Sequence, residues 1–189
     1  MSAIPIDAEG RFAGYASVFN RLDSGGDIVL PGAFAKSLAK RRGRIRLLFQ
    51  HDPKEPVGIW ETIAEDSHGL FVTGRLVPGV PRSDALRRLI ENRALDGLSI
   101  GFRAVRARRD AATGVRRILE ADLWEISVVT FPMLPDARIE SVKGRRARYP
   151  CMDRLREPET RKANRSLAER IRAASRIINK RGRAIWTHQ

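Results

Sequence analysis

Short runs of β-forming residues, each bounded by glycine, proline or aspartate, recur along the first 143 residues. The clearest run, 123–131, is strongly apolar, contains Glu125 and ends at Pro132. Further strands are predicted at 12–19, 28–30, 45–50, 57–63 and 70–76, and on both sides of a hairpin turn at 110–114. Within these 143 residues, only 33–40 and 83–92 have apolar residues at helical spacing, with Ser83 as a candidate N-cap. About seven short strands and two helices predict a mainly β (α+β) fold, a mainly antiparallel barrel or sandwich with helical insertions.

The basic charge of this 189-residue chain is concentrated at its C-terminal end. Residues 1–143 carry 22 basic and 18 acidic side chains, a net of +4, whereas residues 144–189 carry 14 and 4, a net of +10. We therefore expect one domain at 1–143 and a flexible Arg-rich tail at 144–189, with one possible helix at 166–180. Such a tail favours nonspecific contact with polyanions or with an acidic protein partner.

The composition excludes several classes of protein. The single Cys151 cannot form an intramolecular disulfide or build a Cys-rich zinc site, and we expect no metal or cofactor. The longest apolar runs are far shorter than the roughly 20 residues that cross a bilayer. Residues 1–7 lack the pattern of a secretory signal. We therefore expect a protein that is made and used in the cytosol.

Three histidines are the candidate general bases. His51 ends the predicted strand 45–50, and the proline at 53 disfavours helical backbone at the residue before it. A neutral imidazole at such a position can accept a proton near pH 7, although a strand-end histidine more often only makes local hydrogen bonds. His68 lies in a predicted exposed turn, and His188 is the penultimate residue.

Ser99 is the candidate nucleophile. Residues 97–101 formally match the G-x-S-x-G pattern of the α/β-hydrolases. That pattern requires a strand before the serine and a helix after it, whereas here a predicted helix precedes and a strand follows. The hydrolase interpretation therefore fails, but the flanking glycines still leave room for a substrate backbone near the hydroxyl.

A serine nucleophile needs a base that is itself held and supported by a third group. Glu125 could be that group, because a carboxylate within so apolar a strand is costly to bury unless it is paired. It could equally point outward to solvent. Asp122 and Asp52 are rival partners, and a cysteine hydrolase at Cys151 is a weak further option because no positioned base lies near it.

Taken together, five ordered segments resemble the prohead proteases of tailed phages, serine peptidases related in fold to the herpesvirus assemblins. These segments are GYASVFN at 14–20, GDIV with PGAF at 26–34, LFQHDP at 48–53, GLSIGF at 97–102 and DLWEISVVTFP at 122–132. The resemblance covers about residues 11–143. It implies an assemblin-like barrel, with Ser99 as nucleophile and His51 as general base.

The third member of the site departs from the assemblin pattern. Assemblins place a second histidine roughly two dozen residues after the serine, and here that interval ends on Glu125 with no histidine nearby. A carboxylate can also orient and support the imidazolium, so the resemblance favours Glu125 as the third catalytic residue. The resemblance implies cleavage of the capsid protein's scaffolding segment or of a separate scaffold, and of the protease itself. It also implies a possible homodimer, and a location in the host cytoplasm and the procapsid interior. The alternative is a noncatalytic basic scaffold or a nucleic-acid-binding assembly factor on the same fold.

Overall fold

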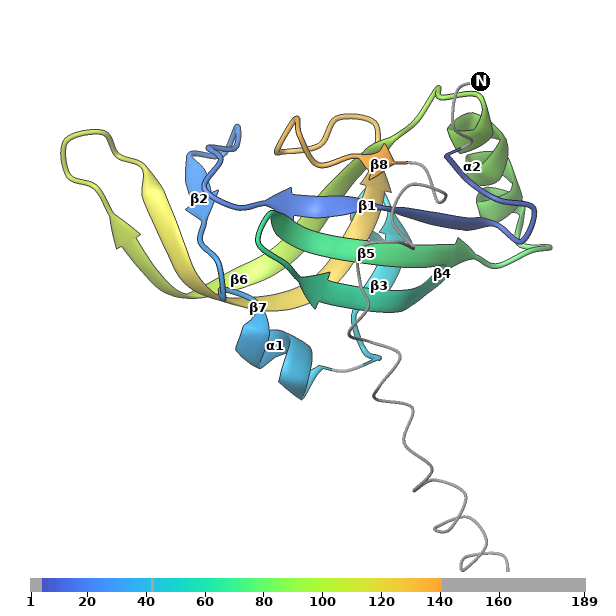
Figure 1. Ribbon diagram of the computed structural model, residues 1–189. Coiled ribbons are helices and arrows are strands. Elements are labelled where there is room, and N and C mark those ends of the chain that lie inside the picture. Colours follow the sequence, from blue (N-terminus) through green and yellow to red (C-terminus); the bar gives the residue numbers. More distant parts are fainter. Residues whose placement is uncertain (1–4, 42, 141–189) are drawn as a thin grey trace, which may run out of the picture. The chain divides into compact units, whose positions relative to one another are not determined.

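The computed structural model describes residues 5–41 and 43–140 (Figure 1). Within these ranges, one sheet contains eight strands and two helices are attached to it. The strands are β1 Arg11–Val18, β2 Asp27–Val29, β3 Arg46–Phe49, β4 Asp52–Glu65, β5 Gly69–Leu76, β6 Gly97–Arg109, β7 Arg116–Val129 and β8 Ile139–Glu140. The helices are α1 Ala35–Lys40 and α2 Pro81–Glu91. The mainly β prediction is therefore confirmed for the described part of the chain.

The expectation of an antiparallel sheet is only partly right, because the sheet is mixed. β6–β7, β4–β5 and β1–β5 are antiparallel pairs, but β2 and β3 both run parallel to β7. β2 pairs with residues 116–118 and β3 with residues 125–128, so that the two short strands follow one another along β7. α1 connects them. The parallel partners themselves are joined by long connections, since β4, β5, α2 and β6 all lie between β3 and β7 in the chain. A local β pattern does not reveal which strands pair.

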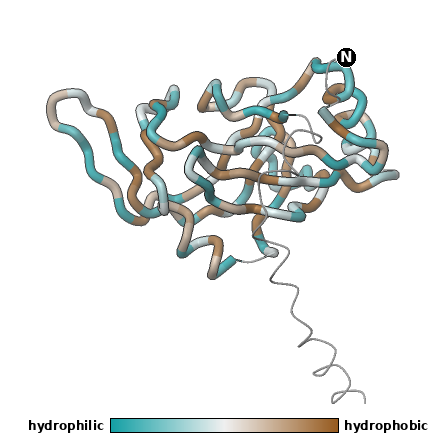
Figure 2. Tube along the Cα trace, viewed as in Figure 1, coloured by the Kyte–Doolittle hydropathy of each residue, from teal (hydrophilic) through white to brown (hydrophobic). Residues whose placement is uncertain are grey.

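The sheet curls into a half-barrel around its core. Next to β8, Arg138 forms a bridge with Gly97 at the start of β6, and the amide of Leu98 donates to the carbonyl of Ala137. The sheet therefore bends far enough for its last segment to reach β6. Hydrophobic residues recur along its strands (Figure 2), and the largest side chains buried inside include Phe12, Phe34, Leu70, Leu123 and Ile126.

Several boundaries differ from the expected ones. The 57–63 strand is the central part of β4, which begins directly after His51. β6 and β7 are continuous strands that form a long hairpin (Figure 1), where the sequence indicated shorter segments around the turn at 110–114. Ser83 is not the N-cap of α2; that position is Val80, and the Ser83 hydroxyl donates to the carbonyl of Val57. The strand β8 was not predicted.

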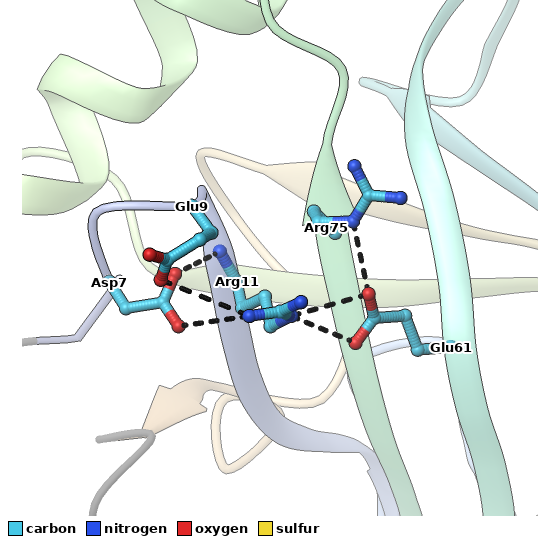
Figure 3. A network of polar contacts seen from close by, with 5 residues as sticks. All are labelled: Asp7, Glu9, Arg11, Glu61 and Arg75. Atoms are coloured by element: carbon cyan, nitrogen blue, oxygen red, sulfur yellow. Dashed lines mark hydrogen bonds and ion pairs between the residues drawn. The ribbon is translucent and has the colours of Figure 1, made fainter.

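An ion-pair network ties β1 to β4 and β5 on the sheet surface (Figure 3). Arg11 and Arg75 are directly opposite each other in the β1–β5 ladder, and the carboxylate of Glu61 lies between them. Its distances to the two Nε atoms are 3.4 and 3.0 Å. Asp7 and Glu9 add contacts to Arg11. The network offsets the repulsion of two opposed cations, and exposed pairs of this kind contribute at most about 1 kcal/mol each.

Two expectations fall on residues that the structure does not describe. The possible helix at 166–180 lies outside the described residues, and the division into a domain at 1–143 and a tail at 144–189 stays a prediction. Among the helices of the described part, none has the length and apolar character needed to cross a membrane.

Candidate active site

The β6–β7 hairpin gathers small and polar residues on one face of the sheet. Ser99 pairs with Ser127, and Gly101 pairs with Glu125. Residues directly opposite in an antiparallel ladder, and residues two apart in one strand, share a face. Ser99, Ser127 and Glu125 therefore lie close together on that face. The intervening positions of both strands enter the hydrophobic core through Leu98, Ile126 and Val128.

His51 lies at the tip of the hairpin between β3 and β4. Phe49 pairs with Asp52, which leaves Gln50 and His51 as the two turn residues. Both have positive φ angles, 53° and 60°, the combination found in type I′ hairpins. That conformation favours glycine and asparagine, and it costs other residues about 1–2 kcal/mol each. The sequence predicted a histidine at a strand end, but not this left-handed backbone.

Hydrogen bonds to the end of β7 hold this strained tip in place. The amide of Gln50 donates to the carbonyl of Val128 at 3.0 Å, and its side-chain amide donates to Thr130 Oγ1 at 2.7 Å. The amide of His51 donates to Ser127 Oγ at 3.1 Å. The backbone strain is therefore offset by contacts with β7 and with the residue that follows it.

The imidazole of His51 is hydrogen-bonded to Glu125. His51 Nδ1 lies 2.7 Å from Glu125 Oε1. An ionised carboxylate only accepts hydrogen bonds, so Nδ1 carries the proton and Nε2 of the neutral ring is free to accept one. This hydrogen bond, with a smaller contribution from the charge of Glu125, raises the pKa of His51 above its usual 6.5 despite partial burial of the ring. The Glu125 side chain is only 13% exposed, whereas that of His51 is 44% exposed.

The carboxylate of Glu125 is held on both sides. Ser127 Oγ donates to Glu125 Oε2 at 2.6 Å. Across the ladder, Gly101 leaves the space that the carboxylate fills, because a Cβ at that position would collide with Glu125 Oε1. The carboxylate thus has one oxygen toward His51 and the other toward Ser127.

Ser99 lies beside this group but is not hydrogen-bonded to it. It is 6% exposed and lines a pocket between β1 and β6, together with Ser17, Val29, Met133 and Leu134 among others. Among the described residues, no hydrogen bond joins Ser99 to His51. Catalytic hydrogen bonds are often long in ligand-free enzymes and tighten when substrate binds, so the arrangement remains compatible with a nucleophile and its base.

The two rival carboxylates have other partners. Asp122 accepts two hydrogen bonds from Arg41, at 2.7 and 2.9 Å, and a third from Trp124 Nε1. The hydrogen bonds from Arg41 and then Trp124 hold the pKa of Asp122 well below its usual value. Asp52 accepts from the amide of Lys54. Of the three candidate carboxylates, the structure places only Glu125 against His51.

The remaining candidates are not part of this arrangement. His68 lies in the turn between β4 and β5, is exposed, and packs edge-on against Tyr15. His188 and Cys151 lie outside the described residues. In the described ranges, 5–41 and 43–140, no group of three or more His, Cys, Asp and Glu side chains could hold a metal ion.

Sequence reasoning missed three residues around the histidine: Ser127, Gly101 and Gln50. Ser127 follows Glu125 by two positions in a predicted strand, so period-two spacing already indicated that the two share a face. Gly101 was noted only as a flanking glycine. No local signal marked Gln50 as a residue of left-handed backbone.

Comparison with known families supports the resemblance read from the sequence. Residues 3–150 match the family described as Caudovirus prohead serine protease. The chain is 42% identical over 141 residues to the prohead protease of Enterobacteria phage HK97, and this alignment covers 72% of this chain and 61% of that protein. It is 29% identical over 146 residues to the prohead protease of Escherichia phage T5, covering 74% and 68%. The chain thus spans about three fifths of the length of the HK97 relative.

One solved structure supports the fold. The bacteriophage T4 capsid assembly protease aligns with a TM-score of 0.56 and 13% identity, over 70% of this chain and 90% of that one. At this identity the likeness concerns the fold alone. The KSHV protease in complex with a hexapeptide phosphonate inhibitor aligns with a TM-score of 0.48 and 14% identity, over 68% and 63%.

Proposed function

This chain belongs to the caudovirus prohead serine protease family, and from that premise we propose that it is a serine endopeptidase of phage procapsid maturation. The observation that carries the proposal is the 2.7 Å hydrogen bond between His51 Nδ1 and Glu125 Oε1, on the same face of the sheet as Ser99. A histidine supported by a buried carboxylate next to a serine is the arrangement that activates a hydroxyl for acyl transfer.

In the proposed mechanism, Ser99 Oγ attacks the scissile carbonyl carbon while His51 Nε2 accepts the hydroxyl proton. Glu125 accepts a hydrogen bond from the Nδ1–H group of His51 and stabilises the imidazolium that forms. The C–N bond then breaks, His51 protonates the leaving amine, and an acyl-enzyme on Ser99 remains. His51 next removes a proton from water as the water oxygen attacks the ester carbonyl. The bond between the acyl carbon and Ser99 Oγ then breaks, and His51 returns the proton to Oγ.

The substrate would bind over the pocket beside Ser99. Met133 lines this pocket and is 54% exposed, and Phe131, two residues earlier, is 90% exposed. Exposed apolar side chains beside a pocket are typical of surfaces that a partner covers. We expect the substrate segment to contact both residues as it crosses the serine.

We propose as substrates the capsid protein's scaffolding segment or a separate scaffold, and the protease itself. The site of action would be the procapsid interior, after synthesis in the host cytoplasm. The net +10 of residues 144–189 would favour contact with a polyanion or an acidic scaffold. An assemblin-like barrel and a homodimer are further parts of this proposal.

Labelling by a serine-directed phosphonate, combined with cleavage of a scaffold–capsid substrate, tests the proposal. Wild-type protein should be labelled and should cleave, whereas Ser99→Ala should do neither. The matched control is Ser37→Ala, which removes a buried hydroxyl that contacts the backbone of Leu123. Undiminished cleavage by Ser99→Ala would refute the assignment of the nucleophile.

The competing reading is a noncatalytic basic scaffold or nucleic-acid-binding assembly factor on the same fold. It predicts no phosphonate labelling, and binding to polyanions that falls steeply with added salt. The paired His51 and Glu125 favour the enzyme, because a scaffold has no need of a strained histidine supported by a buried carboxylate.

A further inference from the structure

We propose that Ser127 is a positioning residue of this site, holding both the carboxylate of Glu125 and the backbone of His51 in the orientation that catalysis requires. The inference rests on the proposed function for its catalytic meaning. The hydrogen bonds of Ser127 with Glu125 and His51 are present whichever residue is the nucleophile.

Ser127 uses its hydroxyl as both donor and acceptor. Its Oγ donates to Glu125 Oε2 at 2.6 Å and accepts from the amide of His51 at 3.1 Å. One hydroxyl has a single proton to donate and lone pairs to accept with, so both roles are filled at once. Ser127 has no exposed surface, so water does not compete for these bonds.

These contacts close a ring of hydrogen bonds. The imidazole of His51 donates a hydrogen bond to Glu125, and the hydroxyl of Ser127 donates another to the same carboxylate. The backbone amide of His51 donates in turn to the hydroxyl of Ser127. The orientation of the imidazole and the left-handed backbone that carries it therefore depend on the same hydroxyl. Without it, the carboxylate could rotate and the strained turn would lose one of its anchors on β7.

Its surroundings argue against Ser127 as the nucleophile. Its register partner Ser99 lines a pocket, whereas Ser127 is completely buried and its proton is committed to Glu125. A nucleophile must approach the substrate carbonyl, which a buried hydroxyl cannot do. Ser127 therefore acts through Glu125 and His51.

The test compares Ser127→Ala, Ser127→Thr and the control Ser37→Ala. Ser37 is also a buried serine whose Oγ contacts β7, through the amide and carbonyl of Leu123 at 2.8 and 3.4 Å. We expect Ser127→Ala to lower kcat by about tenfold or more with little change in KM, as for other residues that orient a reacting group. Ser127→Thr keeps a hydroxyl and should recover most of the rate, and Ser37→Ala should keep the wild-type rate per folded molecule.

A second readout does not require turnover. In a Ser99→Ala background, the titration of the His51 imidazole is followed by NMR with and without Ser127→Ala. Loss of the ring of hydrogen bonds should weaken the bond to Glu125 and move the His51 titration to lower pH. An unchanged titration would overturn the proposal, whatever the rate of Ser127→Ala.

The two readouts separate this inference from the proposed function. If Ser99→Ala still cleaves but the titration of His51 shifts in Ser127→Ala, the peptidase mechanism is wrong and the positioning role stands. If Ser99→Ala is inactive and the titration does not shift, the mechanism stands and the positioning role is wrong. Should Ser127→Thr not fold, Ser127→Cys replaces it, and its weaker donor should give a titration between those of wild type and Ser127→Ala.

Discussion

The carboxylate of Glu125 lies directly over Gly101, its register partner on the neighbouring strand. Any side chain at position 101 would occupy the place of Oε1, the oxygen that binds His51. The absence of a Cβ at Gly101 therefore gives the acidic partner of the histidine its position.

Gly101→Ala should displace Glu125 and lower kcat by about tenfold or more, because loss of the carboxylate contact leaves the imidazole unsupported. Overpacking should also cost about 1–3 kcal/mol of stability. Kinetics and urea unfolding measure the two effects. The control Gly114→Ala has nothing within 4 Å of its Cβ but a positive φ, so it should lose about 1 kcal/mol to strain and keep its activity. Equal kinetics for both variants would contradict the role of Gly101.

Glu125→Gln should change the pH dependence of cleavage. The general base must be neutral, and the hydrogen bond to Glu125 raises the pKa of His51, so the acid limb of kcat/KM in the wild type should lie above pH 6.5. Without the carboxylate charge, the limb should move to lower pH and the plateau should fall. Rates on one peptide substrate between pH 5 and 9 measure this. A profile identical to wild type would assign the supporting carboxylate elsewhere.

The same pair should make stability depend on pH in a defined direction. Because the folded pKa of His51 is raised above 6.5, its contribution to stability is fully present below that pH and is lost as pH rises through the folded pKa. Urea midpoints at pH 6 and pH 8.5 should therefore differ more in wild type than in Glu125→Gln. A larger pH dependence of the urea midpoint in Glu125→Gln would show that the pair does not stabilise the fold at low pH in the direction expected.

Asp122→Asn should weaken the fold without changing the chemistry. Asp122 holds Arg41 and Trp124, and its lowered pKa means that its contribution to stability is present above about pH 3.8 and is lost as pH falls below that value. We expect a lower melting temperature at pH 7 and unchanged cleavage per folded molecule. Normal stability with lost cleavage would make Asp122 the supporting carboxylate.

Phe131→Ala should raise KM several-fold and leave stability within about 0.5 kcal/mol of wild type, because its side chain is 90% exposed and packs little. Val105→Ala is the control, since Val105 is 53% exposed on the β6–β7 hairpin. Initial rates across substrate concentrations separate KM from kcat. If the two variants have the same KM, Phe131 does not contact the substrate.

The side chains that share a face were largely predictable from the sequence. Alternation along 123–131 already set Glu125 apart from its core-facing neighbour Ile126, and the period of two extends that face to Ser127. The strand pairing was not predictable. Each residue of β3 pairs with a residue of β7 that lies 79 positions later in the chain, as Arg46 does with Glu125, and local sequence does not encode which strand becomes a neighbour.

The sequence also left open which of three carboxylates supports His51, because that depends on which strands pair. Spacing alone left Glu125, Asp122 and Asp52 as possible partners of His51, and only the family resemblance favoured Glu125. The left-handed turn at His51 could not be predicted either, since neither turn residue is the glycine or asparagine that usually marks it. Tertiary contacts with β7 maintain a backbone that the local sequence disfavours.

The hydrogen bonds that orient His51 bind it to residues 74 and 76 positions later in the chain. If His51 is the general base, as proposed, a chain still on the ribosome would lack the hydrogen bonds that support it until β7 has been synthesised and docked beside β3, and contacts of such long range form slowly. The proposed peptidase activity would then be acquired only late in folding, and an unfinished copy would not cleave the proteins around it.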